Sequence, residues 1–277
     1  MKIYKTTGGI LVEKEGSLYL LDLEWDEFIN RDDLSGYCTG RLKGLPPVGQ
    51  GGDLPEKELL APVGKQEIWA AGVTYLRSRE ARMEEAQDAG GGDFYDRVYH
   101  AERPEIFFKS NPSRVAGPGE EVRIRKDSAW NVPEPELTLV VSSNAKIIGY
   151  TVGNDMSSRD IEGENPLYLP QAKTYDRSAA VGPCIYVPPS GFPPESRIRI
   201  EIRRGDRRVF DAGVAVSQMK RKPAELVEFL FRETTFPDGC LLMTGTGIVP
   251  PGDFTLQRGD EIRINIDCIG TLFNYVG

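Results

Sequence analysis

Three carboxylates stand out because strand-forming residues surround them. Glu134 and Glu136 fall in PEPELTLVV, and Asp155 follows in KIIGYTVGND. Both segments have strand length and alternation, and the SNAK stretch between them suits a hairpin turn, because Asn144 tolerates a left-handed backbone. If Asn144 and Ala145 form the loop, the numbers of opposed residues sum to 289, and Glu134 lies opposite Asp155.

This pairing places all three carboxylates on one face of the hairpin. Residues two apart on a strand are separated by roughly 6–7 Å, and opposed residues by about 4.5–5.5 Å. Gly149 and Gly153 share the face, which predicts open space above it. Because like charges opposed across strands repel, a bound cation is favoured over the alternative, a solvated face with incidental acids. Mg²⁺ prefers such oxygen ligands.

Histidine and cysteine usage restricts the metal. His100 is the single histidine, so a site with several histidine ligands is excluded. The cysteines are scattered without a CxxC pair, which predicts reduced and mostly buried thiols. They are Cys38, Cys184, Cys240 and Cys268. Oxygen ligands indicate Mg²⁺, with Mn²⁺ or Ca²⁺ as alternatives.

The elements that must position these residues are mainly strands. Strand-like alternation runs along most of the 277 residues, and clear helices are expected only over residues 76–89 and 222–233. The pattern predicts an α+β fold that is mostly β. The stretch GLPPVGQGGDLP predicts a boundary between a small β-rich N-terminal domain (1–62) and a catalytic domain (63–277), and the glycines at 90–92 predict a flexible break.

Composition restricts the partners. A net charge of −8 and a pI near 5.0 disfavour nucleic acids and anionic membranes, which both reward a basic surface. No segment has the pattern of a membrane span or a signal peptide, so the cytoplasm is the expected location.

An ordered set of motifs resembles a known family. PEPELTLVV, GYTVGNDMSSRD, KTYD, GP and TGTG occur in that order, and together they resemble the fumarylacetoacetate hydrolase superfamily over roughly residues 65–277. The resemblance implies that Glu134, Glu136 and Asp155 ligate a divalent metal. It also implies a mixed β-roll with a small N-terminal domain, assembled as a homodimer or a higher homo-oligomer.

One motif departs from the hydrolytic branch of that family. Hydrolases read G-x-N-Y-x-x-H followed by an acid, whereas GVTYLRSRE places Ser78 at the histidine position. A serine without a histidine partner is a poor general base, and His100 lies far along the chain. Three segments, RVYHAERPEIFFKSNPSR, EGENPLYLPQAKTYD and PDGCLLMTGTGIVPPG, are similar instead to the branch that dehydrates 2-keto-3-deoxy-D-arabinonate to 2,5-dioxopentanoate. Glu162 stands where many hydrolases carry a glutamine, which adds an acid near the site.

The resemblance implies a metal-dependent lyase that acts on a small 2-keto acid. The metal stabilises the enolate that forms when carbon 3 of the substrate loses a proton. A base must take that proton and an acid must help the hydroxyl to leave carbon 4. Lys173 and Glu105 are the candidates, and which is the acid stays open. The predicted substrate contacts are Ser78, Lys109, Arg159 and Thr246.

Each candidate has a plainer interpretation. Lys173 is otherwise a surface lysine, and Arg159 otherwise braces its loop. Alternation in PEIFFKS puts Glu105, Phe107 and Lys109 on one face, where Glu105 and Lys109 are otherwise a surface ion pair.

The Gly-rich segments also have two interpretations. Thr246 lies in MTGTGIVPPG, which is otherwise an ordinary turn and is no nucleotide loop, because GK[ST] and a third glycine are lacking. The helix over 76–89, with Arg77, Arg79 and Arg82, is either a lid over an anionic substrate or a solvated helix.

Two other functions stay open. One is a hydrolase or decarboxylase of acylpyruvate-type substrates on the same metal platform. The other is a non-catalytic protein that binds a keto acid and a metal.

Overall fold

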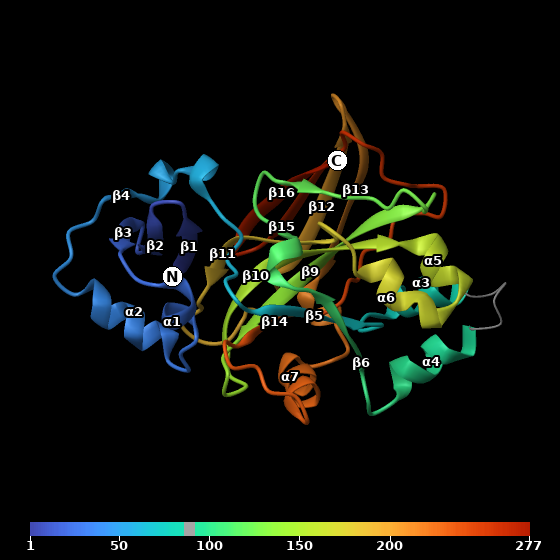
Figure 1. Ribbon diagram of the computed structural model, residues 1–277, viewed down its shortest axis with the longest axis horizontal. Coiled ribbons are helices and arrows are strands. Elements are labelled where there is room, and N and C mark those ends of the chain that lie inside the picture. Colours follow the sequence, from blue (N-terminus) through green and yellow to red (C-terminus); the bar gives the residue numbers. More distant parts are fainter. Residues whose placement is uncertain (86–91) are drawn as a thin grey trace.

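The computed structural model describes residues 1–85 and 92–277 and consists mainly of strands (Figure 1). The strands are β1 (Lys2–Thr6), β2 (Gly9–Lys14), β3 (Ser17–Leu21), β4 (Gly49–Gln50), β5 (Glu67–Gly72), β6 (Glu105–Ser110), β7 (Val115–Ala116), β8 (Glu121–Val122), β9 (Asn131–Val141), β10 (Ile147–Ser158), β11 (Ala179–Tyr186), β12 (Arg197–Arg204), β13 (Arg207–Ala215), β14 (Cys240–Met243), β15 (Glu261–Ile266) and β16 (Gly270–Val276). The helices are α1 (Trp25–Ile29), α2 (Leu34–Leu42), α3 (Leu76–Glu85), α4 (Gly92–His100), α5 (Arg159–Glu164), α6 (Leu169–Lys173) and α7 (Pro223–Phe231). The predicted α+β class, mostly β, is confirmed.

Two sheets share one core. Over the described residues, the larger sheet has 11 strands, ordered β4-β3-β2-β1-β11-β10-β9-β14-β5-β6 with β7 beside β11, and the smaller has five, ordered β13-β12-β15-β16-β8. One hydrophobic cluster contains Leu137 and Val152 of the larger sheet together with Ile200 and Ile264 of the smaller. The sheets therefore pack on each other through common apolar contacts.

The N-terminal strands continue the larger sheet. β1 pairs antiparallel with β11, and Ile3 lies opposite Ile185. Ile3 is fully buried in a cluster with Val181 and Ile185. A domain boundary at residue 62 stays a prediction.

The β9–β10 hairpin carries the carboxylates in the predicted register. Asp155 lies opposite Glu134, and Gly153 lies opposite Glu136. Both strands are buried almost throughout. The pairing that brings the three acids together is therefore confirmed.

The turn of this hairpin differs from the prediction. Ile147 pairs with Val141, one residue out of the register found at the carboxylates, and a β-bulge before Gly149 restores that register. Ser142 accepts the amide of Ala145, and Ala145 adopts the positive φ of 58° that was expected of Asn144. The predicted two-residue turn of Asn144 and Ala145 is therefore wrong. The three-residue loop shifts the pairing by one residue, and the bulge inserts the one residue that compensates.

The glycines of the hairpin permit close packing and leave no open space. A Cβ on Gly153 would lie 2.2 Å from Thr138 Oγ1, and a Cβ on Gly149 would lie 2.5 Å from Ile185 Cγ2. The predicted open space above these two glycines is therefore wrong, because neighbouring side chains fill it.

Sequence patterns identify two of the helices in the described residues. The expected helix over 222–233 is α7, whose Leu226 and Leu230 pack on the sheet beside Leu139 and Leu242. The expected helix over 76–89 is α3 as far as Glu85; its predicted end and residues 90–91 of the predicted break at 90–92 lie outside the described residues, and Gly92 begins α4. α5 and α6, which join β10 to β11, gather with α3 and α4 at one end of the sheet (Figure 1). The short helices α1, α2, α5 and α6, and the helix α4, have no clear pattern in the sequence.

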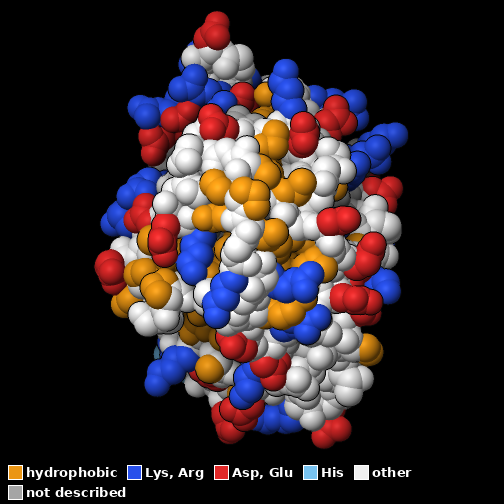
Figure 2. All heavy atoms as spheres, turned by 90° about the vertical axis from the view of Figure 1, so that its left-hand side faces the viewer, with side chains coloured by type: hydrophobic (Ala, Val, Ile, Leu, Met, Phe, Trp, Pro, Cys, Tyr) orange, Lys and Arg blue, Asp and Glu red, His pale blue; other side chains and the backbone are white. Residues whose placement is uncertain are grey.

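Charged side chains of both signs are mixed on the face that Figure 2 shows, which bears the N-terminal strands. None of the described helices is long and apolar enough to cross a membrane. The four cysteines are free, and all but Cys268 are buried, as predicted.

Candidate active site

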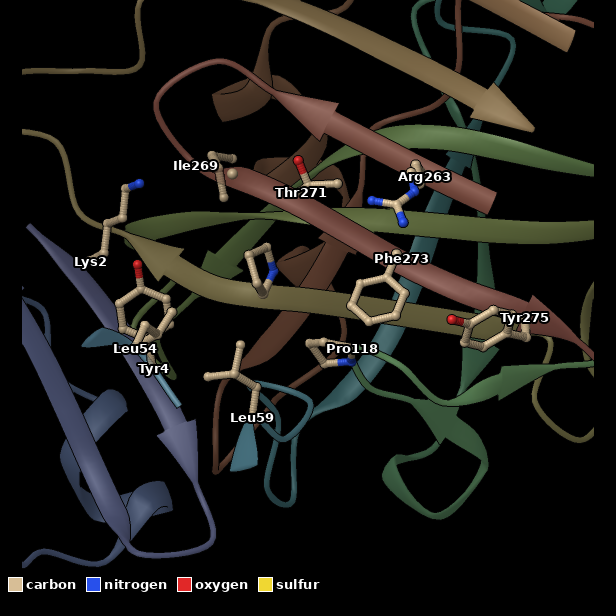
Figure 3. A pocket seen from close by; sticks show the side chains of 12 residues that line it. Lys2, Tyr4, Leu54, Leu59, Pro118, Arg263, Ile269, Thr271, Phe273 and Tyr275 are labelled. Atoms are coloured by element: carbon tan, nitrogen blue, oxygen red, sulfur yellow. The ribbon is translucent and has the colours of Figure 1, made fainter. Parts of the chain in front are cut away.

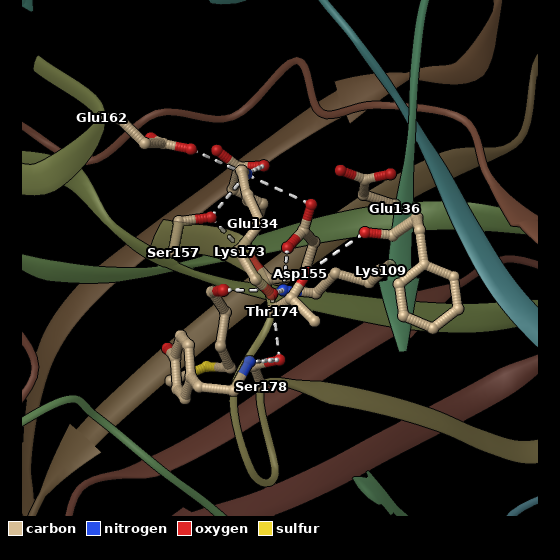
Figure 4. Close-up of polar contacts among 12 residues, drawn as sticks. Lys109, Glu134, Glu136, Asp155, Ser157, Glu162, Lys173, Thr174 and Ser178 are labelled. Atoms are coloured by element: carbon tan, nitrogen blue, oxygen red, sulfur yellow. Dashed lines mark hydrogen bonds and ion pairs between the residues drawn. The ribbon is translucent and has the colours of Figure 1, made fainter. Parts of the chain in front are cut away.

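A cluster of buried carboxylates lies at the centre of the larger sheet. β9 supplies Glu134 and Glu136, and β10 supplies Asp155. Their oxygen atoms lie within 4.8 Å of one another, and the three residues are at most 5% exposed. Figure 4 shows the three side chains converging from the two strands. Three buried carboxylates at this spacing repel strongly unless cations separate them.

Basic side chains from three other places surround the cluster. Lys173, the last residue of α6, places Nζ 2.7 Å from Glu134 Oε2 and 3.1 Å from Asp155 Oδ2. Lys109 of β6 places Nζ 2.5 Å from Asp155 Oδ1. Arg159, at the start of α5, lies 2.7 Å from Glu134 Oε1. Lys173 and Lys109 are almost fully buried, so the surface interpretations of both lysines are wrong.

These contacts set opposite pKa shifts on the two glutamates. Burial opposes ionisation of Glu134, but the charges of Lys173 and Arg159 outweigh it and lower its pKa to about 2. For Glu136, burial together with the charges of Asp155 and Glu134 raises the pKa well above the ordinary value. The ion pairs among the described residues give Glu136 no lysine or arginine partner; it accepts the amide of Gly245 at 2.6 Å.

The donor set fits a divalent metal ion. The acids around the cluster are Glu105, Glu134, Glu136, Asp155 and Glu162, and the bases are Arg82, Lys109, Arg159 and Lys173. With all of these ionised, the described groups carry an excess of negative charge, and of the three carboxylates on β9 and β10 it is Glu136 that has no lysine or arginine partner among the ion pairs of the described residues. Oxygen ligands with uncompensated negative charge suit Mg²⁺.

β6 brings a second candidate for proton transfer toward the same place. Glu105 lies opposite Gly72 of β5, and a Cβ on Gly72 would lie 2.2 Å from Glu105 Oε2. That oxygen is buried without a hydrogen-bond partner among the described residues, and burial raises the pKa of the carboxyl. Phe107 lies beneath Lys173, with Nζ 5.8 Å from the ring centre. The predicted common face of Glu105, Phe107 and Lys109 is present, but Lys109 pairs with Asp155 and no ion pair joins it to Glu105.

Three of the four predicted substrate contacts line a small cavity beside the cluster, and Lys109 does not. Ser78 and Thr246 lie on its wall with Arg159 and Lys173. The Ser78 hydroxyl donates to the carbonyl of Tyr75 at 2.8 Å, and the Thr246 hydroxyl bonds the backbone of Ile248. The cavity holds about 10 Å³, which is roughly the room that one water molecule needs.

Two residues of the site were not among the predicted contacts. Glu162 is 2% exposed and lies 3.0 Å from Arg82 and 3.3 Å from Lys173. Ser157 accepts a hydrogen bond from the same amine, with Oγ 2.6 Å from Lys173 Nζ. Ser157 follows Asp155 by two residues, so strand alternation carries a signal for it. No sequence pattern links Arg82 to Glu162.

Among the contacts between described residues, Arg82 is the arginine of α3 that reaches the site. Arg79 pairs with Asp96 at 3.2 Å, and Arg77 pairs with Glu80 on its own helix at 3.8 Å. Arg82 instead is 5% exposed and faces Glu162. The interpretation of α3 as a solvated helix is therefore wrong for the turn that contains Arg82.

The single histidine does not take the position that Ser78 leaves. His100 is exposed at the end of α4, and its Nδ1 lies 3.5 Å from Asp96.

A larger cavity lies elsewhere and lacks this chemistry. It has a volume of about 540 Å³ and lies where β1 meets β16, between Tyr4, Leu59 and Phe273 (Figure 3). None of the clustered carboxylates lines it, and its polar groups are separate surface side chains such as Lys2 and Arg263. The small cavity beside the carboxylates is therefore the candidate active site.

The sequence and the fold are similar to those of known dehydratases. Residues 67–277 match the family model described as fumarylacetoacetate (FAA) hydrolase C-terminal. A probable 2-keto-3-deoxyxylonate dehydratase of Haloferax volcanii is 48% identical over 80% of this chain and 75% of its own. A 2-dehydro-3-deoxy-D-arabinonate dehydratase of Saccharolobus solfataricus is 44% identical over 78% and 73%.

A solved structure extends the similarity to the whole chain. It is a 2-keto-3-deoxy-D-arabinonate dehydratase in complex with magnesium and 2,5-dioxopentanoate, with a TM-score of 0.83, 33% identity, and coverage of 100% of this chain and 98% of the other. On the match over residues 67–277 and these relatives, the chain belongs to the fumarylacetoacetate hydrolase family.

Proposed function

We propose that this protein is a Mg²⁺-dependent hydro-lyase that converts 2-keto-3-deoxy-D-arabinonate to 2,5-dioxopentanoate. The relatives that are 48% and 44% identical bear the names of dehydratases of such acids. The observation that carries the proposal is local. A buried carboxylate cluster shares its cavity with Lys173, while Ser78 stands where hydrolases of the family place a histidine.

Glu134, Glu136 and Asp155 are the proposed metal ligands. Mn²⁺ or Ca²⁺ would satisfy the same oxygen atoms. Bound there, the ion supplies a Lewis acid for the ketone oxygen of the substrate and makes the protons on carbon 3 more acidic.

The charges of the site suggest how Lys173 and Glu105 divide the proton transfers. Burial lowers the pKa of Lys173, but Asp155, Glu134 and Glu162 outweigh it and raise the pKa above the ordinary value. Lys173 therefore stays an ammonium and stabilises negative charge on the substrate. Glu105 has an unpartnered oxygen and a pKa raised by burial, which suits a group that gains and loses a proton.

The proposed reaction removes one water molecule. Glu105 takes a proton from carbon 3 and returns it to the hydroxyl, which leaves carbon 4 as water while the C3–C4 double bond forms. Proton shifts then convert the unsaturated alcohol into the aldehyde at carbon 5. No external water attacks the substrate, so the reaction needs no histidine at the position of Ser78.

The substrate contacts are proposed from the cavity wall. Thr246 is placed to hold the substrate carboxylate, while the backbone amide of Gly245 beside it donates to Glu136. Ser78 lines the other side, and Arg159 and Lys109 brace Glu134 and Asp155. A five-carbon acid needs more room than one water site, so α3 or the loop at Thr246 must shift when substrate enters.

Location and assembly stay predictions. We propose a cytoplasmic homodimer or higher homo-oligomer with the domain boundary near residue 62. Exposed apolar side chains support a protein partner, because Leu167 is 82% exposed and Tyr168 is 38% exposed on the segment before α6.

A substrate panel tests the function. Purified protein with Mg²⁺ is given 2-keto-3-deoxy pentonates, the matching hexonates and acylpyruvates, and aldehyde and pyruvate products are measured separately. We expect 2,5-dioxopentanoate from 2-keto-3-deoxy-D-arabinonate and little cleavage of acylpyruvates. Rapid release of pyruvate without any dehydration would instead assign the protein to the hydrolases.

A further inference from the structure

Glu162 has contacts that neither metal binding nor proton transfer requires. It is fully buried, and it lies on α5 between side chains of two other helices. We propose that Glu162 is a positioning residue that holds the ammonium of Lys173 in place and links it, through Arg82, to helix α3. This inference rests on the proposed function, because it assigns Glu162 a part in the work of Lys173.

The geometry places Glu162 at the centre of three cations. Arg82 Nη2 and Lys173 Nζ lie 3.0 Å and 3.3 Å from the same oxygen, Oε1, and Arg159 Nη1 lies 3.5 Å from Oε2. These residues are at most 5% exposed. Two cations on one buried oxygen are tightly coupled, because a shift of one changes the charge that the other meets.

The ammonium of Lys173 needs a contact on the side that faces away from Glu134 and Asp155. Its side chain is a flexible four-carbon stem, and Glu134 and Asp155 attract the ammonium toward the proposed metal ligands. Figure 4 shows Glu162 and Ser157 on one side of the amine and Asp155 on the other. Glu162 therefore balances the attraction of the cluster and fixes the amine between the two sides.

Arg82 makes this anchor depend on α3. The same helix carries Ser78 to the cavity wall, so its position helps to define the space for the substrate. When α3 lies over the cavity, Arg82 meets Glu162; when α3 moves away, Glu162 keeps only Arg159 and Lys173 as described partners. Lys173 and Glu162 are therefore held by the full set of contacts only when α3 covers the cavity.

Kinetics of single and double variants test the link. At saturating Mg²⁺, Glu162→Gln and Arg82→Gln should each lower kcat at least about tenfold, a part of the roughly 10²–10³-fold that one preorganised charge-stabilising group contributes, and should change KM much less. The double variant should be no worse than the more damaging single variant, because Arg82 acts through Glu162. Multiplied losses in the double variant would overturn the link to α3.

Asp260→Asn is the matched control. Asp260 is also fully buried, and it pairs with Arg204 at 2.8 Å in the smaller sheet, away from the site. This variant should lose stability and keep its kcat. If Glu162→Gln lowers kcat no more than Asp260→Asn, Glu162 has no positioning role. If Glu162→Gln does not fold, the kcat of Arg82→Gln alone decides whether the link to α3 matters. In that variant Glu162 still has Arg159 and Lys173 as partners.

Hydrogen exchange gives a readout that needs no substrate. Amides of residues 76–85 should exchange at least about tenfold faster in Glu162→Gln than in the wild type, because the contact that holds α3 to α5 is lost. Asp260→Asn should leave these amides unchanged. Unchanged exchange in Glu162→Gln would overturn the link to α3. If the wild type dehydrates no keto-deoxy acid, the proposed function fails, while this exchange experiment still decides whether Glu162 holds α3.

Discussion

Replacing Glu136 by glutamine should stabilise the metal-free protein and weaken metal binding. The carboxylate oxygens of Glu136, Glu134 and Asp155 lie within 4.8 Å of one another. At that separation, two unit charges repel by about 3 kcal/mol at an effective dielectric constant of about 20, and Lys173 offsets part of this. Glutamine keeps the shape and can still accept the amide of Gly245. We expect the free energy of unfolding without metal to rise by about 1–3 kcal/mol.

This stabilisation should grow with pH. Burial and the charges of Asp155 and Glu134 raise the pKa of Glu136, so the folded state binds its proton more tightly than the unfolded chain does. Such a group stabilises the folded state fully below its unfolded pKa, and that contribution is lost as the pH rises through the folded pKa. The wild type therefore loses stability at pH values above the ordinary glutamate pKa of about 4.3. The glutamine variant does not.

Denaturant unfolding and calorimetry measure both effects. Unfolding in chelator between pH 5 and pH 8 compares the two metal-free proteins, and titration with Mn²⁺ compares their affinities. Metal at a hundred times its Kd should stabilise the wild type by about 2.7 kcal/mol, whereas the loss of a ligand should weaken binding to the variant at least about tenfold. A variant that is less stable than the wild type in chelator at pH 8, or that binds Mn²⁺ equally well, would refute the reasoning.

Three further changes test other parts of the site and the fold. Lys173→Met should lower turnover at least about a hundredfold with metal still bound, because one preorganised group that stabilises developing negative charge contributes about 10²–10³-fold; turnover within tenfold of the wild type would remove Lys173 from the mechanism. Gly72→Ala puts a Cβ 2.2 Å from Glu105 Oε2, so the carboxylate must move and turnover should fall at least about tenfold. Gly52→Ala, whose Cβ meets nothing within 4 Å, is its control, and equal turnover of the two variants would contradict the role of Glu105. Limited proteolysis should first cut within residues 44–53, where Val48 is 60% exposed; first cuts inside β9 or β10 would contradict the strand assignment.

The sequence by itself determined the centre of the site because the relations involved are local. Alternation along a strand places Glu134 and Glu136 on one face, and hairpin pairing brings Asp155 opposite Glu134. The detail of the turn was wrong, yet the register at the carboxylates was correct, because the bulge before Gly149 cancels the longer loop. Residues near one another in sequence have few ways to pair, so such local geometry is predictable.

Only the tertiary structure decided what surrounds the carboxylates. Lys109 meets Asp155, and Arg82 meets Glu162, across separations of 46 and 80 residues that no sequence period spans. The same holds for the N-terminal strands, which join the larger sheet where β1 meets β11. These contacts depend on how whole elements pack against one another, and that packing follows from the total burial of apolar surface in the fold. The residues next to a position in the sequence therefore do not predict which distant element will pack against it.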